Sequence, residues 1–330
     1  MGTRRDAPAD GAYTAGVDLG GTKIQTVVIA PGGTDGTLVA GQAREPTPRT
    51  GADDVTAAIV DTVRGAMQEA GIEGGSLRAI GIGSPGRAAD GVVSHSPNVP
   101  GMQDPYPLGP SVSDGLDGVP VTIGNDVAVA TLGELHRGAG RPFNSMIGVF
   151  VGTGVGGGLV LDREIWHGRG GAGEIGHTTV KPDGRRCGCG GHGHLEAYAG
   201  RASMEAKARR LVEDGQHTDL FHLMERHGKD RMTSGIIARA IEHGDEMAIR
   251  LIDRAVWALG LAISSTQNLL DVEAFIIGGG LTERFGQPFV DRIEEQVTPL
   301  LFVPERPPAV LAAELGDLSG AVGAVVLAGG

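Results

Sequence analysis

Strand-like apolar runs that end in glycine turns are the feature that most constrains the fold of this chain. Residues 14–30 give an apolar run, a turn at Gly20–Thr22 and a second apolar run, and residues 146–161 repeat this organisation. A third run, 274–277, leads into Gly278–Gly280. Glycine lets the backbone approach a ligand closely, and its exposed N–H groups suit phosphate. The three turns predict strands whose ends meet a phosphate or a ribose.

The first glycine turn is flanked by Asp18 and Lys23, which offer one acid for a hydrated Mg²⁺ and one cation. Its spacing does not match a Walker A loop. Taken alone, a plain hairpin turn explains it equally well.

The length of 330 residues exceeds the usual domain size of about 100–200 residues. Two domains around a cleft are therefore expected. Between residues 53 and 70, apolar residues recur every four positions, which predicts one buried helix face. The segment 247–270 has a similar pattern and predicts a long helix for the core or for an oligomer interface.

Composition excludes several partners. The formal net charge is −12, whereas binding to nucleic acid needs clustered Lys and Arg. Strongly apolar runs such as 255–263 are shorter than the roughly 20 residues that span a bilayer. Acidic and polar residues follow Arg4 and Arg5, where a twin-arginine signal would have an apolar region. Two cysteines suit a reducing compartment. We therefore expect a cytoplasmic protein with no nucleic-acid or membrane partner.

Both cysteines lie in one glycine-rich loop. Cys187 and Cys189 are separated by one residue, a spacing that seldom lets the Cβ atoms reach the roughly 3.8 Å of a disulfide. His177, His192 and His194 are close in sequence. Thiolate and imidazole are ligands that tetrahedral Zn²⁺ prefers. The loop predicts a zinc site, and an inert pair of thiols is the alternative.

Three polar residues are candidate ligands for hydroxyl groups. Glu174 and Glu196 flank the cysteine loop, where a metal would hold their carboxylates in fixed positions. Alone, each would be a solvated surface acid. Asn98 lies in the proline-rich segment 94–102 and is either a turn residue or a bidentate partner for a hydroxyl. The arrangement indicates a sugar-binding site.

Asn125 and Asp126 follow the predicted strand 119–124, where a helix begins. Local pattern favours Asp126 as the N-cap of that helix, because Asp accepts hydrogen bonds from free N–H groups. The carboxyl end of a strand in an α/β chain also faces the crevice where ligands bind. Both readings remain open on the residues alone.

Five motifs follow one another along the chain: DLGGTK at 18–23, GND at 124–126, GTGVGGG at 152–158, EIGH at 174–177 and CGCGGHGHLE at 187–196. Together they resemble the ROK family, and within it the glucokinase-like sugar kinases. The resemblance implies an α/β, actin-like (ribonuclease H-like), two-domain sugar kinase fold with a cleft between the domains. We expect an N-terminal domain over 12–128, completed by a C-terminal helix over 315–330. A larger domain over 129–314 would carry the zinc loop and the nucleotide site.

Carried over to matching positions, the resemblance implies that Asp126 is the catalytic base and Asn125 a sugar ligand. It implies further sugar ligands at Asn98, Glu174, His177 and Glu196. Nucleotide and Mg²⁺ would be bound by residues of the three glycine turns, namely Asp18, Gly20, Gly21, Thr22, Lys23, Gly152, Thr153, Gly154, Gly278, Gly279 and Gly280.

The chain departs from the family pattern at two positions. Family members hold zinc with the EIGH histidine and three cysteines, but His194 stands here in place of the third cysteine. Cys₂His₂ sites are common, so the expected zinc ligands are His177, Cys187, Cys189 and His194. The sequence does not decide between His192 and His194 as the fourth ligand. Met102 replaces an aromatic residue that many relatives carry, which leaves the preferred hexose open.

These implications predict ATP-dependent phosphorylation of a hexose at its primary 6-hydroxyl, with glucose as the first candidate. The cofactors would be Mg²⁺ with ATP and a structural Zn²⁺. Alternatives are kinases for N-acetylmannosamine, N-acetylglucosamine, allose or mannose, and a non-catalytic sugar sensor. A family repressor is disfavoured, because its helix-turn-helix needs several dozen residues and fewer than 18 precede Asp18. We expect a homodimer or homotetramer. The natural phosphoryl donor stays open.

Overall fold

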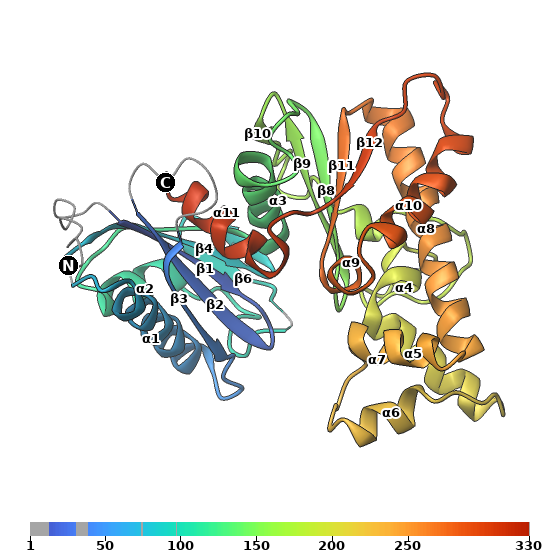
Figure 1. The fold of residues 1–330 in the computed structure, drawn as a ribbon. Coiled ribbons are helices and arrows are strands. Elements are labelled where there is room, and N and C mark those ends of the chain that lie inside the picture. The colour runs from blue at the N-terminus through green and yellow to red at the C-terminus, as the bar shows by residue number, and fades with distance from the viewer. Residues whose placement is uncertain (1–12, 31–38, 74, 97, 330) are drawn as a thin grey trace, which may run out of the picture. The chain divides into compact units, whose positions relative to one another are not determined.

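The computed structural model describes residues 13–30, 39–73, 75–96 and 98–329, which form two compact units. The first unit runs to Arg141 and is completed by the segment from Leu318 onward, and the second unit spans Pro142–Asp317 (Figure 1). The expected boundary at 128/129 falls within helix α3 (Asp126–Arg137), whereas the observed division follows that helix. The expected domain ends at residues 12 and 330 lie outside the described residues.

The first unit is built on a five-stranded sheet in the order β3-β2-β1-β4-β7. Antiparallel pairing joins β1, β2 and β3, whereas β4 and β7 extend the sheet in parallel to β1. The predicted strand-turn-strand of residues 14–30 is confirmed as β1 and β2. A short β5–β6 hairpin follows β4. The strands are β1 (Tyr13–Leu19), β2 (Lys23–Ile29), β3 (Val39–Pro46), β4 (Leu77–Ser84), β5 (Arg87–Ala89), β6 (Val92–Ser94) and β7 (Val121–Asn125).

Helices cover both faces of this sheet. Helix α1 (Ala52–Ala70) packs against β2 and β3 and buries Val55, Ile59 and Val63 completely. This confirms the helix predicted from the four-residue repeat. Helix α2 (Leu108–Gly115) packs beside α1 (Figure 1).

The C-terminal helix α11 (Ser319–Leu327) packs against α3 and lies directly on β1 and β4. A Cβ atom at Gly16 or Gly81 would overlap the backbone carbonyl oxygens of α11. The absence of side chains on these two strand residues therefore allows the helix backbone to touch the sheet. The whole second unit separates α11 from this sheet in sequence, so the first unit is assembled from two segments of the chain that are far apart in sequence.

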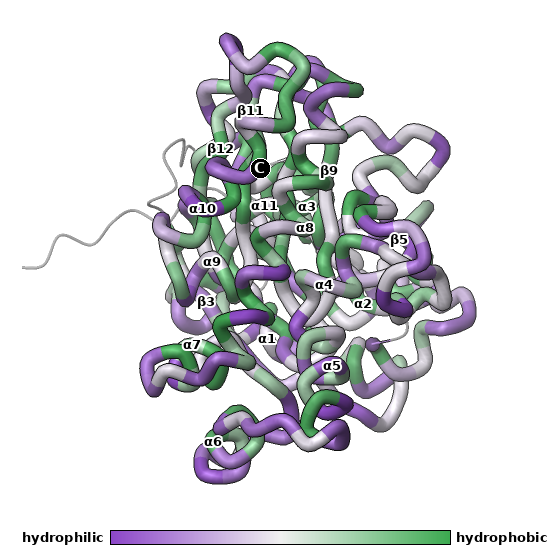
Figure 2. Tube along the Cα trace, turned by 90° about the vertical axis from the view of Figure 1, so that its right-hand side faces the viewer, coloured by the Kyte–Doolittle hydropathy of each residue, from purple (hydrophilic) through white to green (hydrophobic). Residues whose placement is uncertain are grey.

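The second unit repeats the topology with the order β10-β9-β8-β11-β12. Its strands are β8 (Met146–Val151), β9 (Val155–Leu161), β10 (Glu164–Ile165), β11 (Ala274–Gly278) and β12 (Ala309–Ala312). Again the first three strands pair antiparallel and the last two add in parallel. Strand β11 is buried along its whole length and is hydrophobic in Figure 2, as expected for a strand covered on both faces.

The helices of the second unit gather around α8 (Figure 1). They are α4 (Glu196–Ala199), α5 (Arg201–Glu213), α6 (Leu220–Arg226), α7 (Ser234–Glu242), α8 (Glu246–Leu270), α9 (Gly280–Phe285) and α10 (Gln287–Val297), with 3₁₀ turns η1 (Ile175–His177), η2 (Thr298–Leu300) and η3 (Gly316–Leu318). Helix α8 packs against α4, α7 and α10 and buries Leu251, Leu259 and Ile263. The predicted long helix therefore serves the core.

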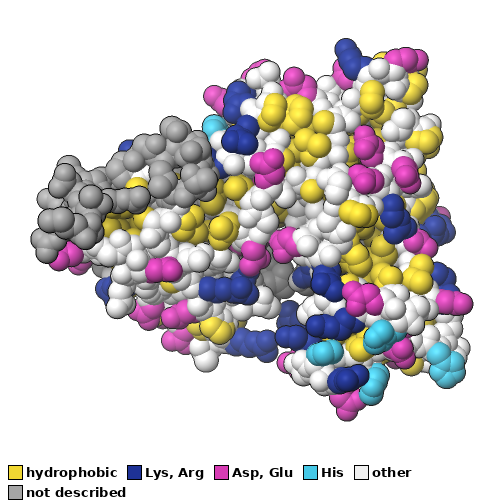
Figure 3. All heavy atoms as spheres, viewed as in Figure 1, with side chains coloured by type: hydrophobic (Ala, Val, Ile, Leu, Met, Phe, Trp, Pro, Cys, Tyr) yellow, Lys and Arg dark blue, Asp and Glu magenta, His cyan; other side chains and the backbone are white. Residues whose placement is uncertain are grey.

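The histidines in and next to α6 face solvent. His217, His222 and His227 are all exposed, and Figure 3 shows histidine side chains on the surface over α6. Within the described part of the chain, no helix combines the length and the hydropathy that crossing a membrane requires.

The cap of α8 generates a prediction with a defined pH dependence. Burial acts to raise the pKa of Asp245, but hydrogen bonds from Ala248 N, the Thr218 hydroxyl, Asp219 N and Met247 N together lower it. A lowered folded-state pKa means that the charged carboxylate stabilises the fold above the unfolded pKa of about 3.9. Asp245→Ala should then reduce the free energy of unfolding by about 0.5–2 kcal/mol at pH 7.

The difference between wild type and Asp245→Ala should shrink as the pH falls below about 4 and through the lowered pKa of the folded state. Urea unfolding across this pH range measures it. Glu246→Ala is the matched control, because the neighbouring side chain is 86% exposed and should change stability by no more than about 0.5 kcal/mol. A pH-independent effect of Asp245→Ala would contradict the linkage.

Candidate functional site

The carboxyl ends of three parallel strands bring the candidate residues of the first unit to one edge of its sheet. Asp18 of β1 pairs with Gly83 of β4, and Gly83 pairs with Gly124 of β7. Asn125 and Asp126 follow directly. Such an edge is where ligands bind in α/β sheets. The register alone therefore places Asp18 on the same edge as Asn125 and Asp126.

Asn125, and not Asp126, is the N-cap of α3. The Asn125 Oδ1 atom accepts hydrogen bonds from Val127 N and Ala128 N, both at 3.1 Å. The local expectation that Asp126 caps this helix is therefore wrong. Asp126 is the first helical residue, and its Oδ1 accepts from Val127 N at 2.9 Å. Asn satisfies helix N-termini as well as Asp does, so capping does not account for Asp126.

The β1–β2 turn and the proline-rich loop meet in the first unit. Gly20 N donates to Lys23 O at 2.9 Å and closes the turn, and the Thr47 hydroxyl donates to Gly20 O at 2.6 Å. A Cβ atom at Gly21 would lie 2.9 Å from Cβ of Asn98. Asn98 is exposed beside this turn. Met102 of the same loop is completely buried, so its side chain packs in the core.

The cysteine loop of the second unit gathers four potential metal ligands. One ligand atom from each of His177, Cys187, Cys189 and His194 lies within 4.8 Å of the others. The Cys189 Sγ atom is 3.3 Å from Nδ1 of His194, and the Cys187 Sγ atom is 3.9 Å from Nδ1 of His177. His192 is exposed and does not belong to this group. The loop geometry thus favours His194 over His192.

The chemistry of this cluster fits a divalent cation. Cys187 is buried and Cys189 is exposed, and neither forms a disulfide. Burial raises the pKa of the Cys187 thiol to about 12, and the nearby Glu196 carboxylate adds to the rise. A thiolate at this position requires a positive charge, which a coordinated metal supplies. Two sulfur and two nitrogen ligands form a common tetrahedral zinc set.

Glu174 and Glu196 lie on either side of the metal-ligand cluster. His177 Nε2 is 3.9 Å from Oε2 of Glu174, whose side chain is 57% exposed. Glu196 Oε1 accepts from the Cys187 thiol at 3.4 Å, and its Oε2 accepts from Val155 N at 3.0 Å. The Glu196 carboxylate therefore connects the cysteine loop to the glycine turn between β8 and β9. Glu174 instead presents its carboxylate to solvent beside His177.

Two glycine turns of the second unit stand next to each other, because β8 and β11 are adjacent parallel strands. Gly152 N donates to Gly154 O at 2.9 Å within the first turn. Gly279 has a φ of 83°, and a Cβ atom there would lie 2.7 Å from the Val151 carbonyl oxygen. Both the conformation and the space require glycine at this position.

Arg201 stands beside these turns and was missed by sequence reasoning. Its Nη1 donates to the Ser234 hydroxyl at 3.2 Å and would lie 2.8 Å from a Cβ atom at Gly280. Burial lowers the pKa of Arg201, although an arginine stays charged at neutral pH. The residue belongs to no recognisable motif. Only its position directly after α4, at the start of α5, hints at a role.

Comparison with known proteins identifies the family. The family model described as ROK family matches residues 14–330. A glucokinase of Streptomyces coelicolor is 34% identical over 322 residues, which cover 96% of this chain and 97% of the relative. The chain belongs to the ROK family. A glucokinase of Thermotoga maritima is 32% identical and covers 86% of each chain.

Solved structures of ROK proteins share the fold. A ROK family glucokinase from Streptomyces griseus, in complex with glucose and AMPPNP, aligns with a TM-score of 0.78 at 32% identity over 96% of this chain and 99% of the other. A ROK hexokinase from Thermus thermophilus aligns with a TM-score of 0.75 at 31% identity, over 96% and 97% of the two chains. The expected two-domain, actin-like α/β fold is therefore confirmed.

The Asn125 cap generates a prediction for the first unit. Asn125→Ala removes both hydrogen bonds to the start of α3 and should reduce the free energy of unfolding by about 0.5–2 kcal/mol. Asn125→Asp keeps an acceptor in the same place and should retain most of that stability. Urea unfolding without sugar or nucleotide measures both variants. Equal stability of wild type and Asn125→Ala would show that the cap contributes nothing.

Proposed function

We propose that this ROK protein transfers the γ-phosphoryl group of Mg-ATP to the primary 6-hydroxyl of a hexose, with glucose as the preferred acceptor. The observation that carries the proposal is Asp126 at the end of β7, in a chain whose glucokinase relatives match over most of its length. Asp126 directly follows the Asn125 cap at the carboxyl end of β7, an edge where ligands bind, and we assign it a chemical role. It would take the proton of the attacking hydroxyl.

The other candidate sugar ligands come from both units. In the first unit, Asn98 and Asn125 would accept and donate hydrogen bonds to sugar hydroxyls. In the second unit, the same task would fall to Glu174 and Glu196, whose carboxylates can accept from several hydroxyls at once, and to the imidazole of His177. Hydrogen bonds of this kind would hold the acceptor oxygen in place, and phosphoryl transfer depends mainly on such positioning.

Nucleotide contacts are proposed for the three glycine turns. Backbone N–H groups in the Gly152–Gly154 and Gly278–Gly280 turns would donate to phosphate or ribose oxygens. The Gly20–Thr22 turn and Lys23 would contribute from the first unit. Asp18 would face the Mg²⁺ that neutralises charge on the transferred phosphoryl group. We add Arg201 to this set, because its partly buried guanidinium stands beside Gly280.

A structural zinc ion is proposed for the Cys₂His₂ cluster. His177 directs Nδ1 towards Cys187 and Nε2 towards Glu174, so one imidazole can hold the metal and still donate a proton to a hydroxyl or to Glu174. Four protein ligands would complete a tetrahedral site, which leaves no position for a metal-bound water. Zinc would therefore fix the loop and take no part in the phosphoryl chemistry.

Hexosamine kinases are the second candidate. An N-acetyl-D-glucosamine kinase of Pectobacterium atrosepticum is 29% identical over 94% of this chain. A coupled ADP-release assay over glucose, mannose, allose, N-acetylglucosamine and N-acetylmannosamine ranks the acceptors. Absence of turnover with all of them would favour a non-catalytic sugar sensor.

The phosphoryl donor is tested by measuring sugar phosphate formation with polyphosphate in place of ATP. We place the activity in the cytoplasm, where ATP is available and cysteines stay reduced, and expect a homodimer or homotetramer by light scattering.

Asp126→Asn tests the assignment of the base. The substitution keeps the size of the side chain but removes its ability to accept a proton, so kcat should fall by about 10²–10⁴. The Kd for the sugar should change far less. Asp61→Asn is the matched control, because that carboxylate is 63% exposed on α1. Near wild-type turnover by Asp126→Asn would remove Asp126 from the mechanism.

Elemental analysis of purified variants tests the zinc site. Wild type should contain about one zinc per chain, as four ligands in one cluster imply. Cys187→Ser and His194→Ala should lose the metal, and KM for the sugar should rise more than KM for ATP. His194→Cys should retain it. His192→Ala is the matched control in the same loop and should keep its zinc. Zinc retained in His194→Ala but lost in His192→Ala would reverse the choice of ligand.

A further inference from the structure

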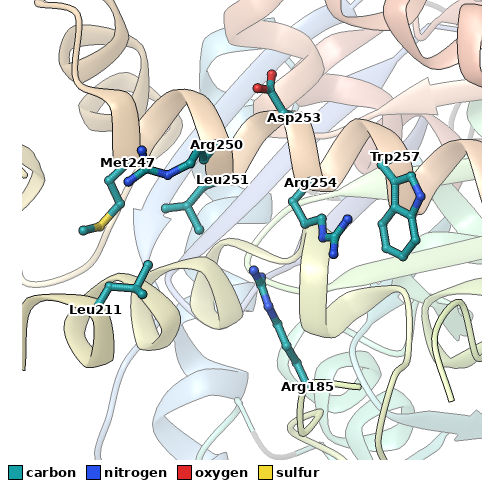
Figure 4. Close-up of a pocket in the computed structure, with 8 residues that line it drawn as sticks. All are labelled: Arg185, Leu211, Met247, Arg250, Leu251, Asp253, Arg254 and Trp257. Carbon is teal, nitrogen blue, oxygen red and sulfur yellow. The ribbon is translucent and has the colours of Figure 1, made fainter. Parts of the chain in front are cut away.

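A pocket of about 410 Å³ lies in the second unit, and none of its lining residues is among the candidate residues above. It is lined by the last part of α5, by one side of α8 and by Arg185 of the cysteine loop (Figure 4). Its size is within the usual range of about 300–1,000 Å³ for small-molecule sites. All of its walls belong to one unit, so it does not depend on how the units are arranged.

Two arginines in the pocket are stacked on aromatic rings. The Arg254 Cζ atom lies 4.2 Å from the ring centroid of Trp257, and the Arg185 Cζ atom lies 4.8 Å from that of Tyr198. The two rings form an edge-to-face pair at 5.8 Å. Stacking uses the flat faces of the guanidinium groups, whereas their N–H donors point outward in the plane. Stacking therefore orients the guanidinium N–H groups and leaves them available to donate hydrogen bonds to a ligand.

These donors are not neutralised by the protein. Arg185 Nη1 is buried and has no hydrogen-bond partner among the described residues, an arrangement that is unfavourable for a charged group. No carboxylate pairs with Arg254 in the described part of the chain. The acid that lines the pocket, Asp253, binds Arg292 at 2.6 Å and points away from both arginines (Figure 4). Arg250 is paired with Glu246 at 3.1 Å.

The remaining wall of the pocket is apolar. Leu211 of α5 faces Met247 and Leu251 of α8 (Figure 4), and the Trp257 ring closes one side. A ligand that fits must therefore carry a compact anion at one end and carbon atoms at the other. Two guanidinium forks match the several oxygens of a phosphate better than the single negative charge of a carboxylate.

We propose that this pocket binds a small organic phosphate, separately from the sugar and nucleotide sites. Its phosphate oxygens accept from Arg185 and Arg254, and its carbon part lies against Leu211, Met247 and Leu251. The proposal does not depend on the proposed kinase activity, because binding is measured without sugar or ATP.

Trp257 provides the readout in a Trp166→Phe background, since Trp166 is the other tryptophan of the chain and is 52% exposed. The zinc-loaded protein is titrated at constant ionic strength with n-butyl phosphate, inorganic phosphate and butyrate. We expect a saturable change in tryptophan fluorescence with n-butyl phosphate, weaker binding of inorganic phosphate and the weakest binding of butyrate. Saturating glucose and the non-hydrolysable nucleotide AMPPNP should not displace n-butyl phosphate.

Variants of the two arginines establish the location. Arg254→Met should weaken n-butyl phosphate binding by about tenfold or more, as expected for a lost charged hydrogen bond, and Arg254→Lys should restore only part of it. Arg185→Met should act alike, but it lies near the metal ligands, so its zinc content and circular dichroism are checked. Arg306→Met removes the same charge from an exposed ion pair with Asp271 and should leave binding unchanged.

Three outcomes would overturn the proposal. The first is no saturable signal with n-butyl phosphate in a protein with full zinc content. The second is equal weakening by Arg306→Met and Arg254→Met, which would indicate unspecific attraction of anions. The third is a change of oligomeric state in Arg254→Met without any phosphate binding by wild type, which would show that a second copy of this acidic chain occupies the pocket.

Discussion

Direct backbone contact at glycine positions is the constraint on which both units depend. Helix α11 can touch β1 and β4 only because Gly16 and Gly81 carry no side chain. In the second unit, Gly279 lies against Val151 in a left-handed conformation, which brings the turn after β11 next to the turn after β8. Overpacking at such contacts costs about 1–3 kcal/mol or more. The same contacts that hold the layers together thus also position the proposed ligand-binding turns.

The Glu196 carboxylate connects two segments of the second unit. It accepts from the Cys187 thiol and from Val155 N, so the cysteine loop and a glycine turn share one partly buried anchor. A carboxylate has further lone pairs for a hydroxyl ligand. Changes in the loop would therefore reach the β8–β9 turn without any rearrangement of the core. Through this link, the proposed metal site would affect substrate recognition without taking part in the phosphoryl chemistry.

Sequence patterns predicted α1, α8 and the strands next to the three glycine turns well, because period and burial agree in those segments. They failed at Asn125, since two adjacent residues with equal capping ability cannot be distinguished before the backbone direction is known. They left the choice between His192 and His194 open, because both histidines stand in the same loop and only the fold shows which imidazole lies close to the cysteines. Arg201, Arg185 and Arg254 gave no signal, because the glycine turn beside Arg201 and the pocket that contains Arg185 and Arg254 combine segments far apart in the sequence. The sequence predicts secondary structure and the chemistry of motifs, whereas contacts between residues of different elements are known only from the fold.

Two neighbouring residues of the cysteine loop belong to two different proposed sites. Cys187 belongs to the metal-ligand cluster, and Arg185, two residues earlier, lines the pocket beside α8. The Tyr198 hydroxyl lies 3.0 Å from Arg185 N, and Tyr198 belongs to α4, the helix that begins with Glu196. An anion held by Arg185 and the carboxylate of Glu196 are thus connected through one short helix. Helix α4 packs on α8, so the packing of these two helices positions both the Tyr198 partner of Arg185 and the Glu196 carboxylate.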